Sequence, residues 1–312
     1  MKIISQHETL PENIKTVVTI GNFDGVHKGH CILLSHTVET AKAAGAKSVA
    51  VTFDPHTRNV LYPQLPTMLL TTFEEKAALI ENLGVDYLLR INFDEQFSGM
   101  GQDKFIEQVL FRQLHACGWV MGEGHSVGKN RAGGKKNLHS EAAKYHINMF
   151  TAVLEAVDET VISSTHIRKL INEGRIQDAV AMLGHPYLIT VEREKGLQIG
   201  TQIGYPTFNF KRPGLQKVIP PAGVYAAEID IGGKKVMGAL YFGDCPTYVG
   251  REVHFEFHAL EFCDREPAVG EAANLWLHRF IRSDVSFSDE KALTGQIKMD
   301  INNIKKYFSQ EM

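Results

Sequence analysis

Residues 21–30 read GNFDGVHKGH, and this stretch decides which fold the chain can adopt. A β-branched run, VVTI at 17–20, precedes it, and residues 31–44 follow it with the apolar spacing of one helix face, up to Gly45. The stretch is therefore predicted to join a buried strand to a helix. Glycines at such a turn let the backbone approach a phosphate, and the helix N-terminus adds partial positive charge there.

Two histidines, His27 and His30, stand at this predicted turn with Gly29 between them. In nucleotidyl transfer, charge develops on the α-phosphate and on the departing pyrophosphate, and each fixed hydrogen-bond donor there is worth roughly 100- to 1000-fold in rate. For an isolated His-x-x-His pair, two surface histidines in a polar turn are an equally good interpretation. The adjoining strand, glycines and helix favour the functional one.

The first half of the chain alternates strand and helix signals. Thr72 and Glu75 have the spacing of a capping box, which opens a helix that Gly84 ends. Further strands are predicted at 48–53, 85–89 and 119–121, and a further helix at 104–114. This alternation predicts a doubly wound parallel α/β sheet. Ligands bind at the carboxyl ends of the strands in such sheets, which is where residues 21–30 lie.

The second half changes character after two helical segments, 164–172 and 176–183. The Gly232-Gly233 pair reads as a hairpin turn between two of the short β runs that follow. These runs lie at 187–191, 223–231, 235–240 and 253–260, and a final helix is predicted at 289–308. Spaced short strands predict a small closed antiparallel β-barrel. We place the domain boundary near residue 185, which gives domains 1–185 and 186–312.

Composition excludes several classes of protein. The 312 residues carry a net charge of −3, so we expect no bulk attraction to nucleic acid or anionic lipid. No apolar stretch approaches the ~18 residues of a membrane helix, and the first residues lack the apolar core of a signal peptide. Four cysteines without a Cys-x-x-Cys pair argue against a zinc site or a disulfide scaffold and favour a reducing, cytoplasmic setting.

Several motifs resemble one family across essentially the whole chain. GNFDGVHKGH resembles the His-x-Gly-His signature of the nucleotidylyltransferase superfamily. Together with the other motifs it resembles the bacterial bifunctional riboflavin kinase/FAD synthetase family. These other motifs are TFDPH at 52–56, GKNRAGG at 128–134, ISSTHIR at 162–168, IGYPTFNF at 203–210, PPAGVYA at 220–226 and EFHALEF at 256–262. The resemblance implies two reactions: riboflavin and ATP give FMN, and FMN and ATP give FAD. It implies Mg²⁺ as cofactor, small-molecule substrates, and no nucleic-acid or membrane partner.

For adenylylation, the resemblance implies that His27 and His30 are catalytic. It implies an ATP site and, from His56, Gly124 and His125, a flavin site. The residues implied for ATP are Gly21, Phe23, Asp24, Gly29, Ser164, Thr165 and Arg168. The last three also have a physical rationale, because hydroxyls and a guanidinium at a predicted helix start suit the β- and γ-phosphates. On its own, a plain helix cap followed by a solvated arginine would be the simpler interpretation of them.

For the kinase, the resemblance implies that Thr207 and Asn209 hold Mg²⁺ and phosphate. Their alternate spacing would place both side chains on one face of a strand. Glu256 is the implied general base, because a carboxylate near the acceptor hydroxyl suits that role. Glu252 is a rival, since REVHFEFH holds Glu-x-His twice. The resemblance further assigns Gly204 and Pro206 to ATP and Arg282 to the flavin.

The chain departs from the family pattern at several positions, which leaves two alternatives open. The departures are Thr57, Gly124, Thr201, Phe208, Tyr241 and Cys245. A degenerate paralogue that only binds or senses flavin would accommodate them. A nucleotidyltransferase acting on pantetheine phosphate or nicotinamide mononucleotide is the other alternative, and the barrel-like second half argues against it.

The departure at Gly124 predicts that adenylylation is the weaker activity. Here a glycine stands where the family has a polar side chain, and one lost hydrogen bond to a charged or buried partner costs about 1.5–3 kcal/mol. Gly124→Asn should therefore raise the rate of FAD formation about ten- to a hundredfold, measured by separating FAD from FMN. No gain in a folded variant would mean that Glu123 or His125 makes the contact, or that residue 124 does not face the ligand.

Overall fold

The computed structural model describes residues 1–122, 135–152, 162–196, 199–214, 216–243, 254–261 and 266–311. The chain divides into two compact units, Met1–Ser163 and Ser164–Met312. Helices α7 (Ser164–Asn172) and α8 (Ile176–Leu183) fall in the second unit, and α8 packs on strands of the barrel found there. The boundary placed near 185 follows these two helices, whereas the division by contacts precedes them.

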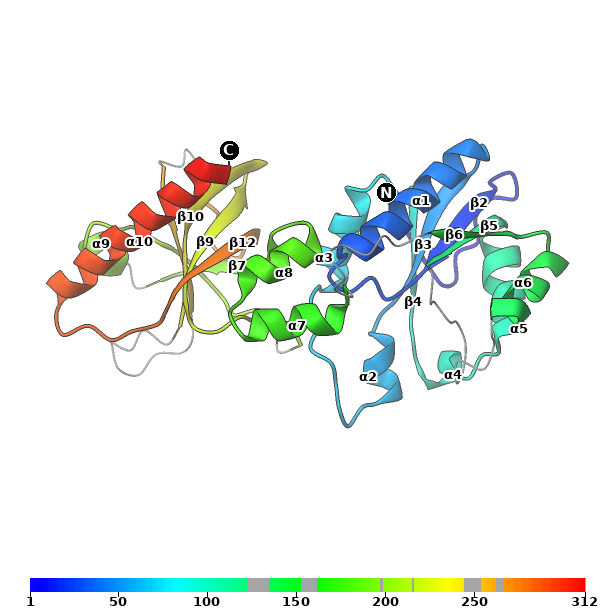
Figure 1. Ribbon diagram of the computed structural model, residues 1–312, viewed down its shortest axis with the longest axis horizontal. Helices are drawn as coiled ribbons and strands as arrows, with labels where there is room; N and C mark the ends of the chain where they lie inside the picture. The colour runs from blue at the N-terminus through cyan, green and yellow to red at the C-terminus, as the bar shows by residue number, and fades with distance from the viewer. Residues whose placement is uncertain are drawn as a thin grey trace. The chain divides into compact units, whose positions relative to one another are not determined.

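The first unit is built on a parallel sheet, as predicted (Figure 1). In the described residues its strand order is β1-β4-β3-β2-β5-β6. The strands are β1 (Lys2–Ser5), β2 (Thr16–Ile20), β3 (Lys47–Phe53), β4 (Tyr87–Ile91), β5 (Ala116–Gly122) and β6 (Asn148–Ala152). The chain leaves β2 toward β3 and β4, and later returns to add β5 and β6 on the other side. This reversal makes the carboxyl ends of β2 and β5 a topological switch point, where ligands of such sheets bind.

Strand β2 lies at the centre of the sheet and is buried along its whole length, so both faces of the sheet must be covered. Val18 and Ile20 share one core cluster with Phe105 and Ile106. The opposite face of β2 packs against helix α1 (Lys28–Ala43). The other helices of the unit are α2 (Thr57–Leu61), α3 (Phe73–Glu81), α4 (Glu95–Ser98), α5 (Gln102–Phe105) and α6 (Lys135–Lys144).

Two features of this unit differ from the sequence-based expectation. The helix predicted at 104–114 is a short α5 followed by a π-helix, η1 (Ile106–Gln113). The end of η1 is tied to the chain start, because the Gln113 carbonyl accepts a hydrogen bond from the Leu10 amide at 3.0 Å. The edge strands β1 and β6 were not predicted. Edge strands are half-solvated and lack the continuous apolar run that marks a buried strand.

The second unit contains a closed antiparallel barrel in the order β10-β11-β8-β7-β12-β9, which confirms the predicted barrel. Its strands are β7 (Tyr187–Glu194), β8 (Phe208–Phe210), β9 (Gly223–Ile231), β10 (Lys234–Gly243), β11 (His254–Ala259) and β12 (Ala272–Ser283), with α9 (Ile199–Gln202) before β8. Strand β12 was missed because register shifts interrupt its pairing with β9 at 277/279 and 280/282, and these break the period of two.

The predicted turn and terminal helix of the barrel are both confirmed. Gly232 and Gly233 have φ of 58° and 80°, the left-handed values that a two-residue hairpin between β9 and β10 requires. Helix α10 (Glu290–Glu311) covers the outside of the barrel through Ile304 and Phe308, which pack on Val224 and Ala226 of β9. Because side chains alternate along a strand, Tyr225 between them points to the barrel interior.

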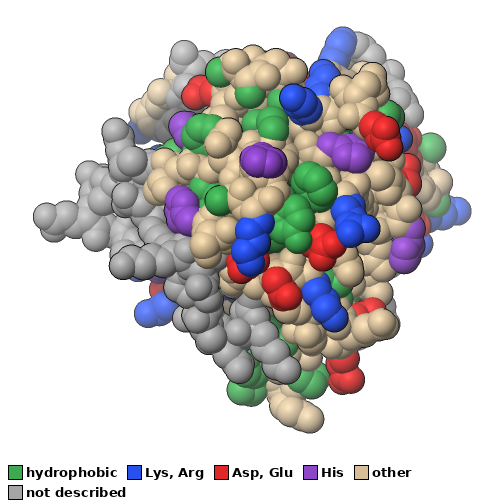
Figure 2. Space-filling view, turned by 90° about the vertical axis from the view of Figure 1, so that its right-hand side faces the viewer, with side chains coloured by type: hydrophobic (Ala, Val, Ile, Leu, Met, Phe, Trp, Pro, Cys, Tyr) green, Lys and Arg blue, Asp and Glu red, His purple; other side chains and the backbone are tan. Residues whose placement is uncertain are grey.

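The described surface carries charges of both signs. Figure 2 shows one face on which the basic, acidic and histidine side chains drawn in colour are interspersed. This mixture agrees with the small net charge of −3.

Candidate functional site

The 21–30 turn has a backbone that ordinary residues rarely adopt. Gly25 has φ of 82°, and the non-glycine residues Phe23 and Val26 have φ of 48° and 39°. Both side chains are buried, and the Val26 amide donates to the Phe23 carbonyl at 3.1 Å, so packing holds the strained conformation in place. Strain of this kind clusters at ligand sites, where the backbone must present a fixed surface.

The two histidines lie together at the start of α1, as predicted. His27 caps the helix, and its Nδ1 accepts a hydrogen bond from the His30 amide at 3.4 Å. The rings of His27 and His30 are stacked, with centroids 3.6 Å apart. Since Nδ1 of His27 accepts, its neutral tautomer carries the proton on Nε2, which is then a donor. A Cβ at Gly29 would lie 3.4 Å from the His27 ring, an ordinary van der Waals distance.

Asp24 is built into the scaffold of the turn. Its carboxylate is 3% exposed and accepts from the amides of Leu70 and Thr71, each at 3.0 Å, and from the Thr71 hydroxyl. The same hydroxyl oxygen accepts from the Gly25 amide at 3.0 Å. These contacts join the turn to the segment that leads into α3. A contact between Asp24 and ATP stays a prediction, as it does for Gly21 and Phe23, whose ring packs against His30.

A buried lysine beneath the turn was not predicted to take part in the site. Lys76 of α3 donates to the Asn22 carbonyl at 3.0 Å, to the Thr52 hydroxyl at 2.9 Å and to the Phe53 carbonyl at 3.4 Å. Burial lowers the pKa of Lys76 to about 8. The sequence does carry a signal for it, because Lys76 shares a helix face with Leu79 and Ile80. A cation on an apolar face needs buried partners.

The TFDPH segment lies next to the turn, at the carboxyl end of β3. The Asn22 amide nitrogen donates to the Thr57 hydroxyl at 3.0 Å, so the departure at Thr57 provides a direct link between the two segments. His56 caps α2, and its Nδ1 accepts from the Arg58 amide at 3.2 Å. Flavin binding by His56 stays a prediction. Gly124 and His125, which were expected at the same flavin site as His56, lie outside the described residues.

The ISSTHIR segment provides the start of α7, which begins at Ser164 as predicted. Thr165 is exposed, and Ser164 and Arg168 are half-buried. All three belong to the second unit, whereas the histidines belong to the first. Their contact with ATP bound at the 21–30 turn stays a prediction.

The residues predicted for the kinase come together on neighbouring strands of the barrel. Asn209 of β8 pairs with Glu256 of β11, and the Thr207 hydroxyl donates to the Glu256 carboxylate at 3.5 Å. The same cross-strand row continues to Tyr241 of β10 on one side and to Glu194 of β7 on the other. Glu194 was not predicted to take part. Glu252, the rival base, lies outside the described residues.

Two glycines let the chain before β8 press against these side chains. A Cβ at Gly196 would lie 2.1 Å from the Asn209 amide nitrogen, and one at Gly200 would lie 2.2 Å from the Tyr205 carbonyl and 3.2 Å from the Thr207 hydroxyl. Such close backbone approach leaves no room for a side chain at either position. The backbone at Gly196 and Gly200 therefore lies directly against Asn209 and Thr207.

His258 holds the Pro206-Thr207 segment against β11. Its Nδ1 lies 2.9 Å from the Pro206 carbonyl, which can only accept, so Nδ1 carries the proton. The ring also meets Tyr205 edge-on, with centroids 5.6 Å apart. Gly204 has φ of 86°, which turns the chain into this position. ATP contacts of Gly204 and Pro206 stay predictions, and their placement beside Thr207 is compatible with them.

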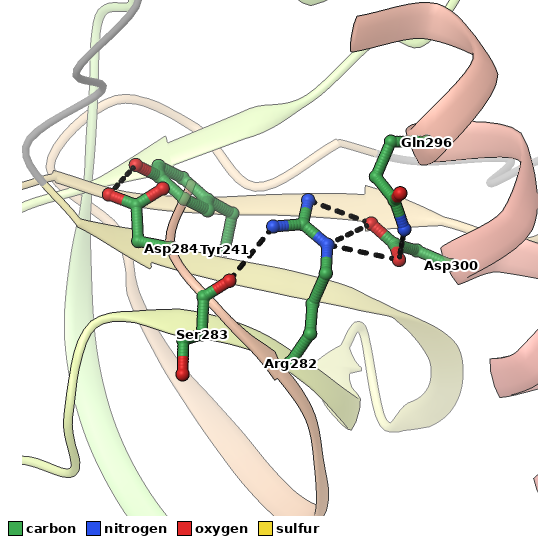
Figure 3. A network of polar contacts seen from close by, with 6 residues as sticks. All are labelled: Tyr241, Arg282, Ser283, Asp284, Gln296 and Asp300. Atoms are coloured by element: carbon green, nitrogen blue, oxygen red, sulfur yellow. Dashed lines mark hydrogen bonds and ion pairs between the residues drawn. The ribbon is translucent and has the colours of Figure 1, made fainter. Parts of the chain in front are cut away.

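Arg282 is part of a network that joins β12 to α10 (Figure 3). Its Nε and Nη2 both lie 2.9 Å from Oδ2 of Asp300, and its Nη1 donates to the Ser283 carbonyl at 3.0 Å. Gln296 donates to the same carboxylate at 2.8 Å. Arg282 therefore anchors the terminal helix to the barrel. Its contact with flavin stays a prediction.

Two bulky departures have clear places in the barrel. Phe208 points opposite to Asn209 and stacks with Phe257, with ring centroids 6.5 Å apart, so its phenyl group fills the core side of β8. Tyr241 donates a hydrogen bond to Asp284 at 3.0 Å, as Figure 3 shows. Thr201 is exposed, and Cys245 lies outside the described residues.

The barrel site fits a magnesium ion bound together with a nucleotide. Mg²⁺ prefers oxygen ligands and commonly keeps substrate phosphates among them. The Thr207 hydroxyl and the side-chain amide of Asn209 provide such oxygens, next to the Glu256 carboxylate. Among the described residues, no group of three or more His, Cys, Asp or Glu side chains could hold a metal. Phosphate oxygens of a bound nucleotide would complete a ligand set of this kind.

Comparison with known proteins identifies the family to which the chain belongs. The family model for FAD synthetase matches residues 9–166, and that for riboflavin kinase matches residues 183–308. A bifunctional riboflavin kinase/FMN adenylyltransferase from Buchnera aphidicola subsp. Schizaphis graminum is 33% identical and covers 99% of each chain. The chain belongs to the bifunctional riboflavin kinase/FMN adenylyltransferase family. The relative from Bacillus subtilis is 31% identical over 97% of this chain and 96% of its own.

One solved structure has a similar fold over nearly the whole chain. It is named as a macrolide-efflux protein from Streptococcus pneumoniae, has a TM-score of 0.85 and covers 98% of this chain and 99% of its own. At 24% sequence identity, the likeness shows the fold alone. In the part of the chain that the structure describes, every helix is too short or too polar to cross a membrane.

The close approach at Gly196 gives a direct test of the barrel site. Gly196→Ala should displace Asn209 and lower FMN formation about tenfold or more, because displacements of about 1 Å can cost up to a hundredfold. FAD formation from added FMN should persist, since the 21–30 turn is in the other unit. Gly214→Ala is the matched control, because a Cβ there meets nothing within 4 Å. Equal FMN formation by both variants would contradict the assignment.

Proposed function

We propose that this chain phosphorylates riboflavin to FMN at the barrel and adenylylates FMN to FAD at the 21–30 turn. The proposal rests on one observation: each of the two structural units has its own group of side chains suited to phosphate chemistry. A stacked histidine pair caps a helix at the switch point of the parallel sheet. A hydroxyl, an amide and a carboxylate gather on one face of the barrel. Each unit contains most of the segment matched by one family model.

For adenylyl transfer, the turn acts by positioning and by donating hydrogen bonds. Nε2–H of His27 and the ring of His30 would donate to the α-phosphate and to the departing pyrophosphate. These donors are fixed before the reaction, because His27 caps the helix and the two rings stack. Preorganised donors stabilise developing charge without reorganising during the step. The phosphate oxygen of FMN attacks the α-phosphorus of ATP, pyrophosphate leaves, and no covalent enzyme intermediate is required.

For the kinase, Glu256 would accept the proton of the ribityl 5′-hydroxyl as that oxygen attacks the γ-phosphorus of ATP. Its neighbours Phe255 and Phe257 are fully buried, which places the carboxylate on a rigid strand at the edge of an apolar core. Thr207 and Asn209 would hold Mg²⁺ and the phosphates. When bound, the ion neutralises the charge that develops on the transferred phosphoryl group. The spacing of the cysteines supports a cytoplasmic setting for both reactions.

A first experiment tests the role of the histidine pair. His30→Ala should lower FAD formation about a hundredfold or more, because it removes a donor aimed at developing charge. FMN formation should stay nearly unchanged, since the barrel site is separate. Both rates are measured on the same sample by chromatographic separation of riboflavin, FMN and FAD. An equal loss of both products would contradict the assignment of two sites.

A second experiment identifies the kinase base. Glu256→Gln should lower FMN formation about a hundredfold or more, in line with usual general-base contributions, while keeping the shape of the side chain. Glu252→Gln, four residues earlier, should have little effect. The readout is the FMN-forming rate at saturating riboflavin and ATP. If neither variant is impaired, the barrel does not use a carboxylate base, and the flavin-binding alternative gains support.

A further inference from the structure

Residues outside the 21–30 turn hold its backbone in place from two directions. From one side, the carboxylate of Asp24 is fastened to the amides of Leu70 and Thr71, just before α3 begins. From the other side, Lys76 in α3 reaches back under the turn to the Asn22 carbonyl at 3.0 Å. The capping box of Thr72 and Glu75 fixes the start of α3 between these two points.

The ammonium group of Lys76 has three N–H donors, and three oxygen acceptors of the protein lie within reach of them. It reaches the Asn22 carbonyl after β2 and, on β3, the Thr52 hydroxyl and the Phe53 carbonyl. All three protons are therefore used within the protein, so none is left for a phosphate. Lys76 is 7% exposed, which also keeps it from direct contact with substrate. Its role must act through the backbone that it holds.

The charged groups that face Lys76 come from every element around it. They are Asp24 in the turn, Asp54 after β3, Arg90 on β4 and Glu74 on α3. Arg90 also pairs with Asp54 and lies over the Phe73 ring at 4.3 Å. Desolvation outweighs the attraction of the acidic groups, which is why the pKa of Lys76 falls from 10.5 to about 8.

The sign of this shift matters for stability. Because the folded protein holds the proton less tightly than the unfolded chain does, the charged lysine costs folding free energy at neutral pH. This cost disappears as the pH rises through the window from about 8 to about 10.5. A buried charge that lowers stability beside a ligand site is the arrangement expected of a residue kept for function.

We propose that Lys76 is a positioning residue for adenylyl transfer, whose ammonium group holds the Asn22 carbonyl and thereby the left-handed backbone that presents His27 and His30. This inference rests on the proposed FAD-forming function of the turn. Loss of the proton leaves two donors for three acceptors, so the turn loses one restraint at alkaline pH. FAD formation should then weaken while FMN formation at the barrel does not.

The test compares FAD formation from FMN with FMN formation from riboflavin on each sample, as a ratio, across pH. In the wild-type protein the ratio should fall about two- to tenfold above pH 8, the loss expected for one hydrogen bond. Lys76→Met should lower the ratio about ten- to a hundredfold at neutral pH and remove its pH dependence. Lys42→Met, at an exposed lysine in the last turn of α1, is the control and should match the wild type.

The outcomes separate the two levels of the proposal. If the wild-type protein forms no FAD, the proposed function of the turn is wrong. If it forms FAD but Lys76→Met keeps the wild-type ratio and pH profile, Lys76 has no positioning role. If Lys76→Met loses FMN formation as well, the variant has not folded, and the pH profile of the wild-type protein decides instead. A decline of the FAD-to-FMN ratio centred near the pKa of Lys76 supports the inference. A ratio that does not change with pH overturns it. Lys76→Arg, which stays charged, should flatten the profile if it folds.

Discussion

The hydrogen bonds of the buried Asp24 carboxylate are the interaction on which the 21–30 turn, the proposed adenylylation site, depends. The 21–30 turn contains two non-glycine residues, Phe23 and Val26, in the left-handed region, and such residues cost of order 1–3 kcal/mol each. The hydrogen bonds from Leu70 and Thr71 to Asp24 hold the turn to a segment some 46 residues later in the chain. Without this anchor the backbone would relax, and the stacked histidines would lose their common orientation.

A different constraint organises the barrel. Here the proposed kinase site lies on a row of side chains across four antiparallel strands. In this row Glu194, Asn209, Glu256 and Tyr241 occupy paired positions. Closure of the barrel fixes the register of every strand, so each member of the row is placed by backbone pairing. Along β8 and β11, the phenylalanines next to Asn209 and Glu256 point to the opposite side and fill the core of the barrel. The polar side chains of the proposed site and the apolar side chains of the core therefore lie on opposite faces of each strand.

The departures from the family pattern become intelligible in this setting. The phenyl ring of Phe208 points to the core, so it adds packing rather than bulk beside Asn209. Thr57 accepts a hydrogen bond from Asn22, and Tyr241 donates one to Asp284. Each of these three side chains therefore has a hydrogen-bond or packing partner within the protein. The described departures thus leave the groups proposed for phosphate chemistry in place, and they argue against the degenerate alternative for the barrel.

The sequence by itself determined the two architectures and the principal candidates. Alternating strand and helix signals specified the parallel sheet, because a buried parallel strand must read as an apolar run. Likewise, the glycines and histidines of residues 21–30 marked a turn suited to phosphate. Local spacing also identified the capping box of Thr72 and the hairpin at Gly232-Gly233. In each case the interaction lies within a few residues of the chain, where periodicity and turn chemistry are informative.

Only the tertiary structure decided which distant residues support these sites. In the sequence, Lys76 is one charged residue in a predicted helix. The structure shows that its ammonium group donates a hydrogen bond to the Asn22 carbonyl. Gly196 is unremarkable until the chain packs it against Asn209, and Arg282 until α10 brings Asp300 to it. Strand β12 was hidden because its register shifts erase the alternation. The physical reason is the same throughout: these contacts join segments that no local pattern connects, so only the folded chain reveals them.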